Sequence, residues 1–321
     1  MNLLLIFLLF SPMVLAQRPV HTYSIVARDP TTGELGVAVQ SHWFAVGPLV
    51  CWAEAGVGAI ATQSFVNPAF GQEGLALLAE GYSAPEALEL LVQGDAGREV
   101  RQVALVDAQG QAAAWTGSKC IESAGHYCEP NFCVQANLMI NDSVWPQMAK
   151  AFQHSSGPLA ERLLAALEAA QQAGGDLRGQ QSAALLVVAA KPSGAVWKDR
   201  LVDLRVDDHP EPLVELRRLL KLHRAYEHMN RGDAALERGA MDEALSAYSR
   251  AQQLAPDKIE MRFWTAVTLI NLNSVDAAIP MLRETFASSS VWATLLERLH
   301  QKGHLRCSGE TLQRLLQLHK P

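Results

Sequence analysis

The sequence places two hydroxyl side chains near the start of its first predicted strand. Over residues 22–28 the side chains alternate as in a half-buried β-strand, and Thr22 and Ser24 are among the polar positions. Such a hydroxyl becomes a nucleophile when a base removes its proton. Residues 29–33, Asp-Pro-Thr-Thr-Gly, are typical of a turn, because proline fixes φ and glycine accepts positive φ. We therefore predict a hairpin, with its return strand over residues 35–41.

Amide and hydroxyl side chains also end the next two predicted strands. Gln40 and Ser41 end the return strand, and Gln63 and Ser64 end a third strand that scarcely alternates, as expected of a strand buried on both faces. If these strands are neighbours, the four side chains converge on Thr22, where glutamine amides could stabilise a negatively charged oxygen. The same residues could instead satisfy backbone groups at the strand ends, and the two interpretations carry equal weight.

Four further polar residues are predicted to bind substrate: His42, Asn67, Gln135 and Asn137. His42 is a candidate base, although lone histidines are more often structural or solvated. Gln135 and Asn137 share one face of a predicted strand, where they would bind an amide substrate or satisfy a network in the core. Asp176 and Arg178 would clamp a carboxylate or, more simply, form a solvated ion pair.

The five cysteines fit an oxidising compartment loosely. Cys120, Cys128 and Cys133 follow the pattern Cys-x7-Cys-x4-Cys, which is a poor match to the paired ligands of a zinc site. We predict instead one local disulfide, most simply between Cys128 and Cys133. Cys51 lies in an apolar run and is predicted to be a buried thiol. No metal or cofactor is expected.

The predicted elements follow the order strands, two helices, strands, two helices, strands. Helices are predicted at 71–80, 83–92, 144–154 and 159–172, and the later strands at 101–107, 111–116, 132–140, 182–190 and 197–206. Ser83 and Glu86 have the spacing of a capping box. Hairpin-linked strands with helices inserted in pairs favour antiparallel sheets over βαβ units. The predicted fold class is α+β: a four-layer α-β-β-α sandwich of two antiparallel sheets, followed by a small all-α module.

Three stretches of the sequence carry a family resemblance. They are Thr-Tyr-Ser-Ile-Val-Ala-Arg-Asp-Pro from Thr22, Gly-Glu-Leu-Gly-Val-Ala-Val from Gly33, and Ala-Ile-Ala-Thr-Gln-Ser-Phe-Val-Asn-Pro-Ala-Phe-Gly from Ala59. In these stretches the chain resembles the domain of unknown function 1028 family, whose members are regarded as relatives of the N-terminal-nucleophile (Ntn) hydrolases. The resemblance implies an Ntn-hydrolase-like sandwich over residues 17–223 and, less directly, hydrolysis of an amide bond.

The resemblance also implies a role for Thr22 as nucleophile. An Ntn hydrolase attacks with the first residue of its mature chain, whose own α-amine, with a pKa of about 7.7–8.0, takes the proton. Here Gln17-Arg18-Pro19-Val20-His21 would precede Thr22 after removal of a leader. Either a second cut follows His21, or Thr22 is an ordinary strand hydroxyl. The alternative function is a non-catalytic envelope protein that binds a small molecule, peptide or peptidoglycan fragment.

The first residues have the pattern of a signal peptide. Leu3 to Phe10 is an uninterrupted apolar run, and Val14-Leu15-Ala16 has the small residues of a cleavage site before Gln17. We predict a signal peptide over residues 1–16, and a periplasmic or secreted protein with no later membrane span. The net charge of −6, without a basic stripe, argues against a nucleic-acid partner.

From Pro212 onward the sequence predicts helices only. Small, aromatic and helix-breaking residues have the spacing of a tetratricopeptide unit: Gly232, Gly239, Ala244, Tyr248, Ala251 and Pro256. We predict tetratricopeptide-like repeats over residues 224–303 and a tail over 304–321. Because two repeats bury little surface alone, a protein partner is expected at this module, and a homodimer is plausible. The family's C-terminal extension is sometimes described as peptidoglycan-binding, which would suit an exported protein.

Overall fold

The computed structural model describes residues 22–319, which divide into two compact units between Arg217 and Arg218. The first unit combines strands and helices, and the second is built from helices. The mixed α+β class is therefore confirmed. The predicted signal peptide over residues 1–16 and the predicted cut after His21 lie outside the described residues.

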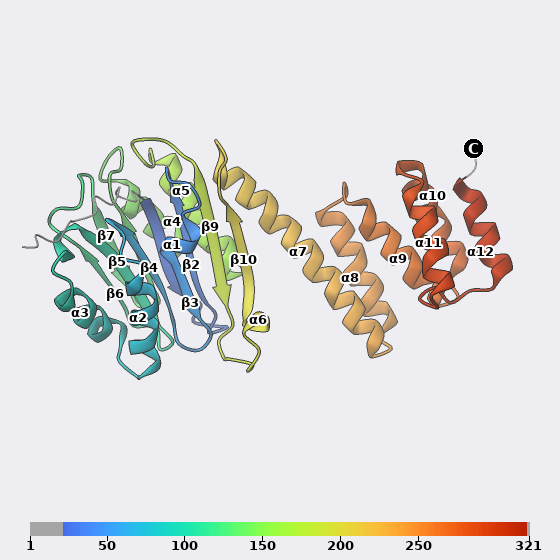
Figure 1. Ribbon diagram of the computed structural model, residues 1–321, viewed down its shortest axis with the longest axis horizontal. Helices are drawn as coiled ribbons and strands as arrows, with labels where there is room; N and C mark the ends of the chain where they lie inside the picture. Colours follow the sequence, from blue (N-terminus) through green and yellow to red (C-terminus); the bar gives the residue numbers. More distant parts are fainter. Residues whose placement is uncertain (1–21, 320–321) are drawn as a thin grey trace, which may run out of the picture. The chain divides into compact units, whose positions relative to one another are not determined.

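Six antiparallel strands form the larger sheet of the first unit. They are β1 (Thr22–Arg28), β2 (Leu35–Ser41), β7 (Gly125–Glu129), β8 (Phe132–Ala136), β9 (Ser182–Val188) and β10 (Arg200–Val206). Their spatial order is β10-β9-β2-β1-β8-β7 (Figure 1). The predicted hairpin is confirmed, since β1 pairs with β2 and Thr22 lies opposite Ser41. Because β8 pairs with the other edge of β1, Thr22 begins an interior strand.

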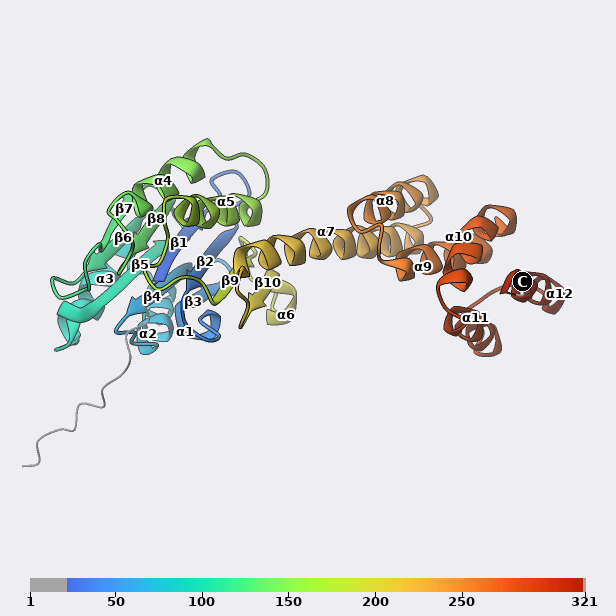
Figure 2. The ribbon, with the colours of Figure 1, turned by 90° about the horizontal axis from the view of Figure 1, so that it is seen from above.

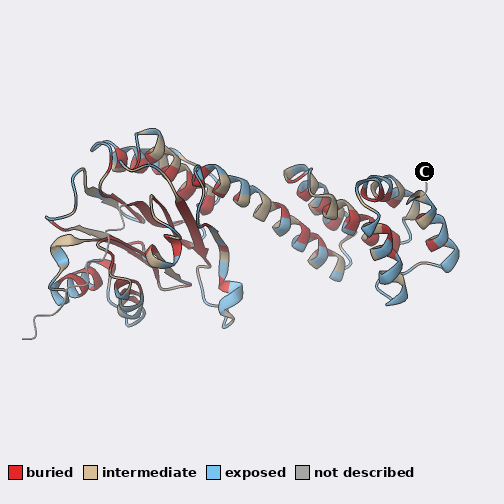
Figure 3. Cartoon of the chain, turned by 45° about the horizontal axis from the view of Figure 1, so that its top comes forward, coloured by how far each residue is buried: buried red, intermediate tan, exposed pale blue. Residues whose placement is uncertain are grey.

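Four antiparallel strands form the second sheet, in the order β3 (Cys51–Glu54), β4 (Gly58–Ser64), β5 (Arg101–Asp107) and β6 (Ala112–Thr116). A one-turn helix, α1 (Gly47–Val50), precedes β3. Both faces of β1, β2, β4 and β9 are buried or nearly so, and Figure 3 shows the corresponding strands in red. Each of these strands is therefore covered by one layer of the fold on each of its faces.

Helices cover the outer face of each sheet, and the two inner faces pack on each other. The helices α2 (Ala69–Ala79) and α3 (Ala84–Gly94) contact the four-stranded sheet, while α4 (Val144–His154) and α5 (Leu159–Gln172) contact the six-stranded sheet. Figure 2 shows α4 and α5 on one side of the strands and α2 on the other. Because side chains alternate along β1, those on one face point to the other sheet and those on the opposite face point to the helices. Val26 joins the apolar core between the sheets, and the hydroxyl of Tyr23 bonds to Gln171 of α5.

Short elements account for most differences from the sequence prediction. The pattern did not indicate β3, β7, or α6 (Val196–Asp199), because four or five residues are too few to show a period. The predicted strand 132–140 ends at Ala136, since Leu138 has a positive φ of 55°. The capping box is confirmed, because the Glu86 carboxylate accepts hydrogen bonds from both the backbone N–H and the hydroxyl of Ser83.

A disulfide joins Cys128 of β7 to Cys133 of β8, as predicted. The two cysteines lie directly opposite each other in the hairpin. The bond therefore ties the edge strand β7 to its neighbour β8. Among the described residues, Cys51, Cys120 and Cys307 are free thiols.

Removing this disulfide should destabilise the first unit. For so short a closed loop, the chain-entropy model gives a loss of about 2 kcal/mol in the free energy of unfolding for the Cys128→Ser, Cys133→Ser double variant. Urea denaturation followed by circular dichroism would measure it. Cys307→Ser is the control, because it removes a free thiol and should change stability by less than about 0.5 kcal/mol. Equal unfolding midpoints for wild type and double variant would contradict the expectation.

Helices build the second unit. After α7 (Pro212–Glu237), which begins in the first unit, they are α8 (Met241–Leu254), α9 (Ile259–Asn271), α10 (Val275–Ser288), α11 (Val291–Gln301), α12 (Gly309–Leu316) and a final 3-10 turn, Gln317–His319. The predicted tail is thus helical in part: Leu312 and Leu315 of α12 are buried in the same apolar cluster as Phe263. No helix within residues 22–319 is both long and apolar enough to cross a bilayer.

Candidate functional site

Thr22 and Ser24 point into the space between the two sheets. They share a face of β1 with Val26, which belongs to the core between the sheets, and both are fully buried. The hydroxyl of Thr22 donates a hydrogen bond of 3.1 Å to the hydroxyl of Ser41 on the neighbouring strand. The first two predicted hydroxyls therefore lie in the interior of the fold, together with Ser41.

Gln63 reaches Thr22 from the facing sheet. Its Nε2 donates to the backbone carbonyl of Thr22 at 3.1 Å, and its Oε1 accepts a bond of 2.7 Å from the Ser24 hydroxyl. The prediction that β2 and β4 are neighbouring strands is wrong: β4 belongs to the second sheet and lies opposite β2. Convergence of Gln63 on Thr22 thus comes from sheet packing and not from strand pairing.

Gln102 of β5 takes part in five hydrogen bonds in this region, and the sequence pattern did not predict it. Its Oε1 accepts from Gln63 Nε2 at 2.7 Å and from Asn137 Nδ2 at 2.9 Å. Its Nε2 donates to the hydroxyl of Thr116 and to the carbonyls of Ala136 and Gly125. The signal in the sequence was one polar residue directly before the apolar run Val103–Val106, on the inward face that Ala104 also occupies.

Gln135 and Asn137 complete the cluster from the six-stranded sheet. Gln135 Nε2 donates to the Ser24 hydroxyl at 3.2 Å and to the carbonyl of Ala61 at 2.9 Å. The backbone N–H of Asn137 donates to the Thr22 carbonyl at 3.1 Å. We call these seven residues the inter-sheet polar cluster: Thr22, Ser24, Ser41, Gln63, Gln102, Gln135 and Asn137. All seven are fully buried, and none carries a charge.

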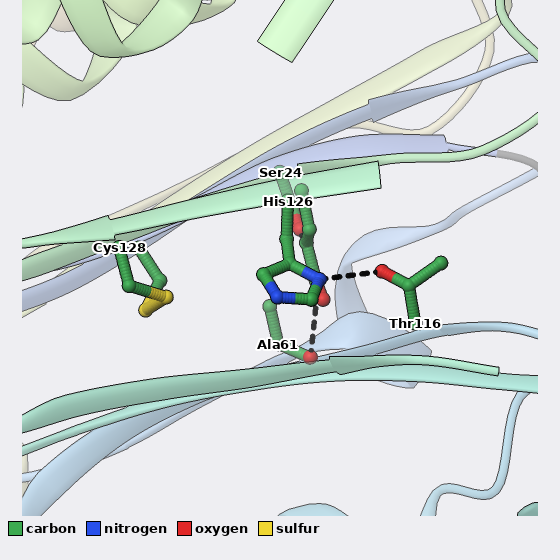
Figure 4. The surroundings of a disulfide bond; sticks show 7 residues. Ser24, Ala61, Thr116, His126 and Cys128 are labelled. Carbon is green, nitrogen blue, oxygen red and sulfur yellow. Dashed lines mark hydrogen bonds between the residues drawn. A yellow bond between two sulfur atoms is a disulfide. The ribbon is translucent and has the colours of Figure 1, made fainter. Parts of the chain in front are cut away.

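The cluster continues to the surface through Thr116 and His126. Figure 4 shows His126, on the six-stranded sheet, facing Thr116, on the four-stranded sheet. Thr116 Oγ1 lies 2.8 Å from His126 Nδ1 and 2.9 Å from Gln102 Nε2. Desolvation lowers the pKa of His126, although part of its side chain reaches solvent. His126 is thus connected to the Thr22 carbonyl through Thr116 and Gln102, and then through either Gln63 or Asn137.

Gln40 and Ser64 were predicted to converge on Thr22, and the structure corrects this. Gln40 lies on the opposite face of β2 from Ser41. Gly36 is on the same face as Gln40, and this face packs on α5, because an added Cβ at Gly36 would lie 2.7 Å from Leu163. Both polar atoms of its amide are buried without a hydrogen-bond partner among the described residues. Ser64 shares a face with Ile60, which packs on α2 and α3, and has a positive φ of 67°.

The remaining predicted residues lie outside the cluster. His42 donates its backbone N–H to Asp176, whose buried carboxylate also pairs with Arg178 at 2.7 Å. The predicted ion pair therefore exists, but its carboxylate is not solvated. Asn67 accepts a hydrogen bond from the backbone of Ala69 at the start of α2.

Two other titratable groups near these residues have shifted pKa values. Burial, followed by the charge of Asp176, raises the pKa of Tyr23 well above its usual range. Burial also raises the pKa of the Cys120 thiol, and the hydroxyl of Ser64 beside it opposes that shift. Both groups are therefore held in their neutral forms. Within residues 22–319, no group of three or more His, Cys, Asp or Glu side chains is arranged to hold a metal ion.

The inter-sheet polar cluster can present a hydroxyl and fixed amide donors, but no charged base. Thr22 Oγ1 donates to the Ser41 hydroxyl at 3.1 Å. The side chain of Gln63 and the backbone N–H of Asn137 donate to the Thr22 carbonyl. Amide donors of this kind stabilise an oxyanion, but they cannot remove the proton of a hydroxyl. Nucleophilic chemistry at Thr22 therefore needs a base from another source.

Comparison with known proteins identifies the family of this chain. The model of a family described as a family of unknown function (DUF1028) matches residues 22–216. A crystal structure of a DUF1028 protein from Silicibacter pomeroyi is 34% identical, with a TM-score of 0.56, over 63% of this chain and 85% of that protein. None of the curated proteins matches.

A second solved structure is much less similar. Anbu (ancestral beta-subunit) from Yersinia bercovieri is 14% identical, with a TM-score of 0.30, over 62% of this chain and 93% of that protein. At this TM-score the likeness is too weak to carry an argument.

Proposed function

The chain belongs to the DUF1028 family over residues 22–216, and from this premise we propose that its first unit is an Ntn-hydrolase-like domain that hydrolyses an amide bond with Thr22. The observation that carries the proposal is the position of Thr22: it is the first residue of an interior strand between two antiparallel sheets, inside a cluster of amide donors. An amidase that attacks with a hydroxyl also needs donors of this kind to stabilise the oxyanion.

The neutrality of the cluster supports the α-amine of Thr22 as the base in this proposal. None of its seven residues has a titratable side chain, so the α-amine of Thr22 itself is the group that can take the hydroxyl proton. With a pKa of about 7.7–8.0, a free α-amine is a suitable base at neutral pH. The same amine would then donate the proton to the leaving nitrogen.

This mechanism requires that the bond between His21 and Thr22 be cut. An acylated nitrogen at Thr22 is not basic, and the Thr22 side chain is fully buried in the uncut chain. We propose that export removes residues 1–16 and that a second cleavage follows His21. The disulfide Cys128–Cys133 supports an oxidising periplasmic or extracellular location.

N-terminal sequencing of the mature protein tests the proposal directly. Protein recovered from the periplasm or medium should begin at Thr22 and should release product from amide substrates. Mature protein that begins at Gln17 and still cleaves amides would contradict the role of the Thr22 amine. Full-length protein retained in the cytoplasm with Met1 intact would contradict export.

A second candidate function is ligand binding without catalysis. The closure of the inter-sheet polar cluster counts against catalysis at Thr22, because the amides of Gln63 and Gln102 are each bonded through both polar atoms. Such a network can serve to fix the packing of two sheets. The two candidate functions predict different results at Thr22, because only amide hydrolysis depends on the Thr22 hydroxyl.

For the second unit we propose tetratricopeptide-like helix pairs that bind a protein or glycan partner. Tyr248 of α8 packs on Gly232 of α7 so closely that an added Cβ would lie 2.3 Å from its ring, which is the small-against-aromatic packing that the repeat pattern predicts. A cavity of 380 Å³ between α7 and α9 is lined by Tyr226 and Trp264, which are 40% and 42% exposed. Exposed aromatic side chains are common at binding surfaces.

A further inference from the structure

The cavity between α7 and α9 lies wholly within the second unit, and its lining residues restrict the ligand it can take. It runs between one face of each helix. On α7, Tyr226 and Asp233 line it two helical turns apart, and on α9, Glu260 and Trp264 line it one turn apart. Its volume of 380 Å³ falls within the range of ligand pockets, about 300–1,000 Å³.

An aromatic ring and a carboxylate meet at one end of this cavity. The hydroxyl of Tyr226 on α7 donates a hydrogen bond to the carboxylate of Glu260 on α9. Trp264 follows Glu260 by four positions, and because the side chains of a helix lean toward its N-terminus, the indole points back to the turn that carries Glu260. Its ring packs edge-on against the buried ring of Phe263, with the two centroids 5.4 Å apart. A ligand group at Glu260 therefore lies beside the Tyr226 ring and one turn from the Trp264 ring.

Both charged side chains that line the cavity are carboxylates. Asp233 accepts a hydrogen bond of 2.6 Å from the hydroxyl of Tyr248, so neutral phenols bind both acids. Among the residues that the structure describes, no lysine, arginine or histidine lines the cavity. The basic residues nearest to Glu260 in the sequence pair with other acids: Lys258 with Asp257 at 3.8 Å, and Arg262 with Glu284 at 3.0 Å. The two negative charges of the cavity are thus available to a cation.

We propose that this cavity binds an arginine side chain from a basic segment of a partner protein. The guanidinium pairs with the carboxylate of Glu260 and stacks on the indole of Trp264, because its planar, weakly hydrated cation suits both groups. Asp233, about 10 Å further along α7, attracts additional positive charge of the same segment. An anionic peptide or glycan would be repelled by the two carboxylates. The inference rests on the proposed binding role of the second unit, and it specifies a protein partner.

Nuclear magnetic resonance titration of the whole folded protein tests the site. The readouts are the indole N–H signal of Trp264 and the backbone N–H signal of residue 260. The probes are acetyl-Gly-Arg-Gly-amide and acetyl-Gly-citrulline-Gly-amide, since citrulline keeps the shape of arginine without its charge. The arginine peptide should shift both signals and bind at least about tenfold more tightly than the citrulline peptide.

Two substitutions separate the contributions of charge and ring. Glu260→Gln keeps an acceptor for the Tyr226 hydroxyl but removes the charge, so it should weaken binding of the arginine peptide by about tenfold and abolish its advantage over citrulline. Trp264→Leu, followed at residue 260, should weaken binding by about two- to fivefold. Glu297→Gln and Trp197→Leu are the matched controls. They change an exposed glutamate and an exposed tryptophan that do not line the cavity, and they should leave the affinity unchanged.

Muramyl dipeptide, an anionic peptidoglycan fragment, is the probe for a glycan partner. If it shifts the same signals and binds more tightly than the arginine peptide, the arginine site is wrong while a binding role for the second unit stands. If neither probe shifts these signals in folded wild type, both the arginine site and the binding role of this cavity are overturned. Equal affinities of wild type and Glu260→Gln for the arginine peptide would also overturn the proposal.

Discussion

Replacement of Thr22 by alanine is expected to abolish amide hydrolysis by the mature protein while the first unit stays folded. The variant keeps the terminal amine but removes the hydroxyl that attacks, so kcat/KM should fall by at least about 10³-fold. The fold should survive because the backbone carbonyl of Thr22, which Gln63 and Asn137 hold, is unchanged. Amine release from short N-acyl peptides measures activity, and thermal unfolding followed by circular dichroism measures the fold.

Two further substitutions sharpen this test. Thr22→Ser keeps the hydroxyl and loses only a methyl group, so it should retain part of the activity. Thr31→Ala makes the same change as Thr22→Ala on an exposed turn and should leave activity unchanged. Activity that persists in Thr22→Ala would exclude Thr22 as the nucleophile and would require another nucleophile in this protein.

Local patterns in the sequence predicted the elements that position Thr22. Alternation over 22–28 and the Asp-Pro-Thr-Thr-Gly turn predicted the hairpin, and its register places Thr22 opposite Ser41. Both signals act over a few residues, which is why they can be recognised without knowledge of the rest of the fold. The disulfide Cys128–Cys133 was predictable for the same reason, because its two cysteines lie across one tight turn.

The same local rules could not decide which face of a strand points to the second sheet. Gln40-Ser41 and Gln63-Ser64 are the same dipeptide at the ends of strands, yet Ser41 faces inward in one case and Gln63 in the other. A strand alternates strictly, so each pair must place one member on each face. The choice is made by the helices and sheets that cover the strand, and these come from distant parts of the chain.

The largest expected effect on stability follows from Gln102, the residue that local patterns did not reveal. Gln102→Leu keeps the approximate size of the side chain but removes its amide. Gln63 and Asn137 then lose an acceptor, while Thr116 and the carbonyls of Ala136 and Gly125 lose a donor. A buried polar group without a partner costs about 1–3 kcal/mol. Because several groups are affected and some keep a second partner, we expect a loss of about 3–5 kcal/mol in the free energy of unfolding.

Urea denaturation of the folded chain measures this loss, and Gln109→Leu is the control. Gln109 lies exposed in the turn between β5 and β6, so the same substitution there should change stability by less than about 0.5 kcal/mol. Gln102→Glu separates the two halves of the amide, because a carboxylate keeps an acceptor for Gln63 but has no N–H for Ala136. If Gln102→Leu unfolds at the same urea concentration as wild type, the cluster does not stabilise the packing of the two sheets. If only Gln102→Glu is tolerated, the acceptor that orients Gln63 toward the Thr22 carbonyl is the part that matters.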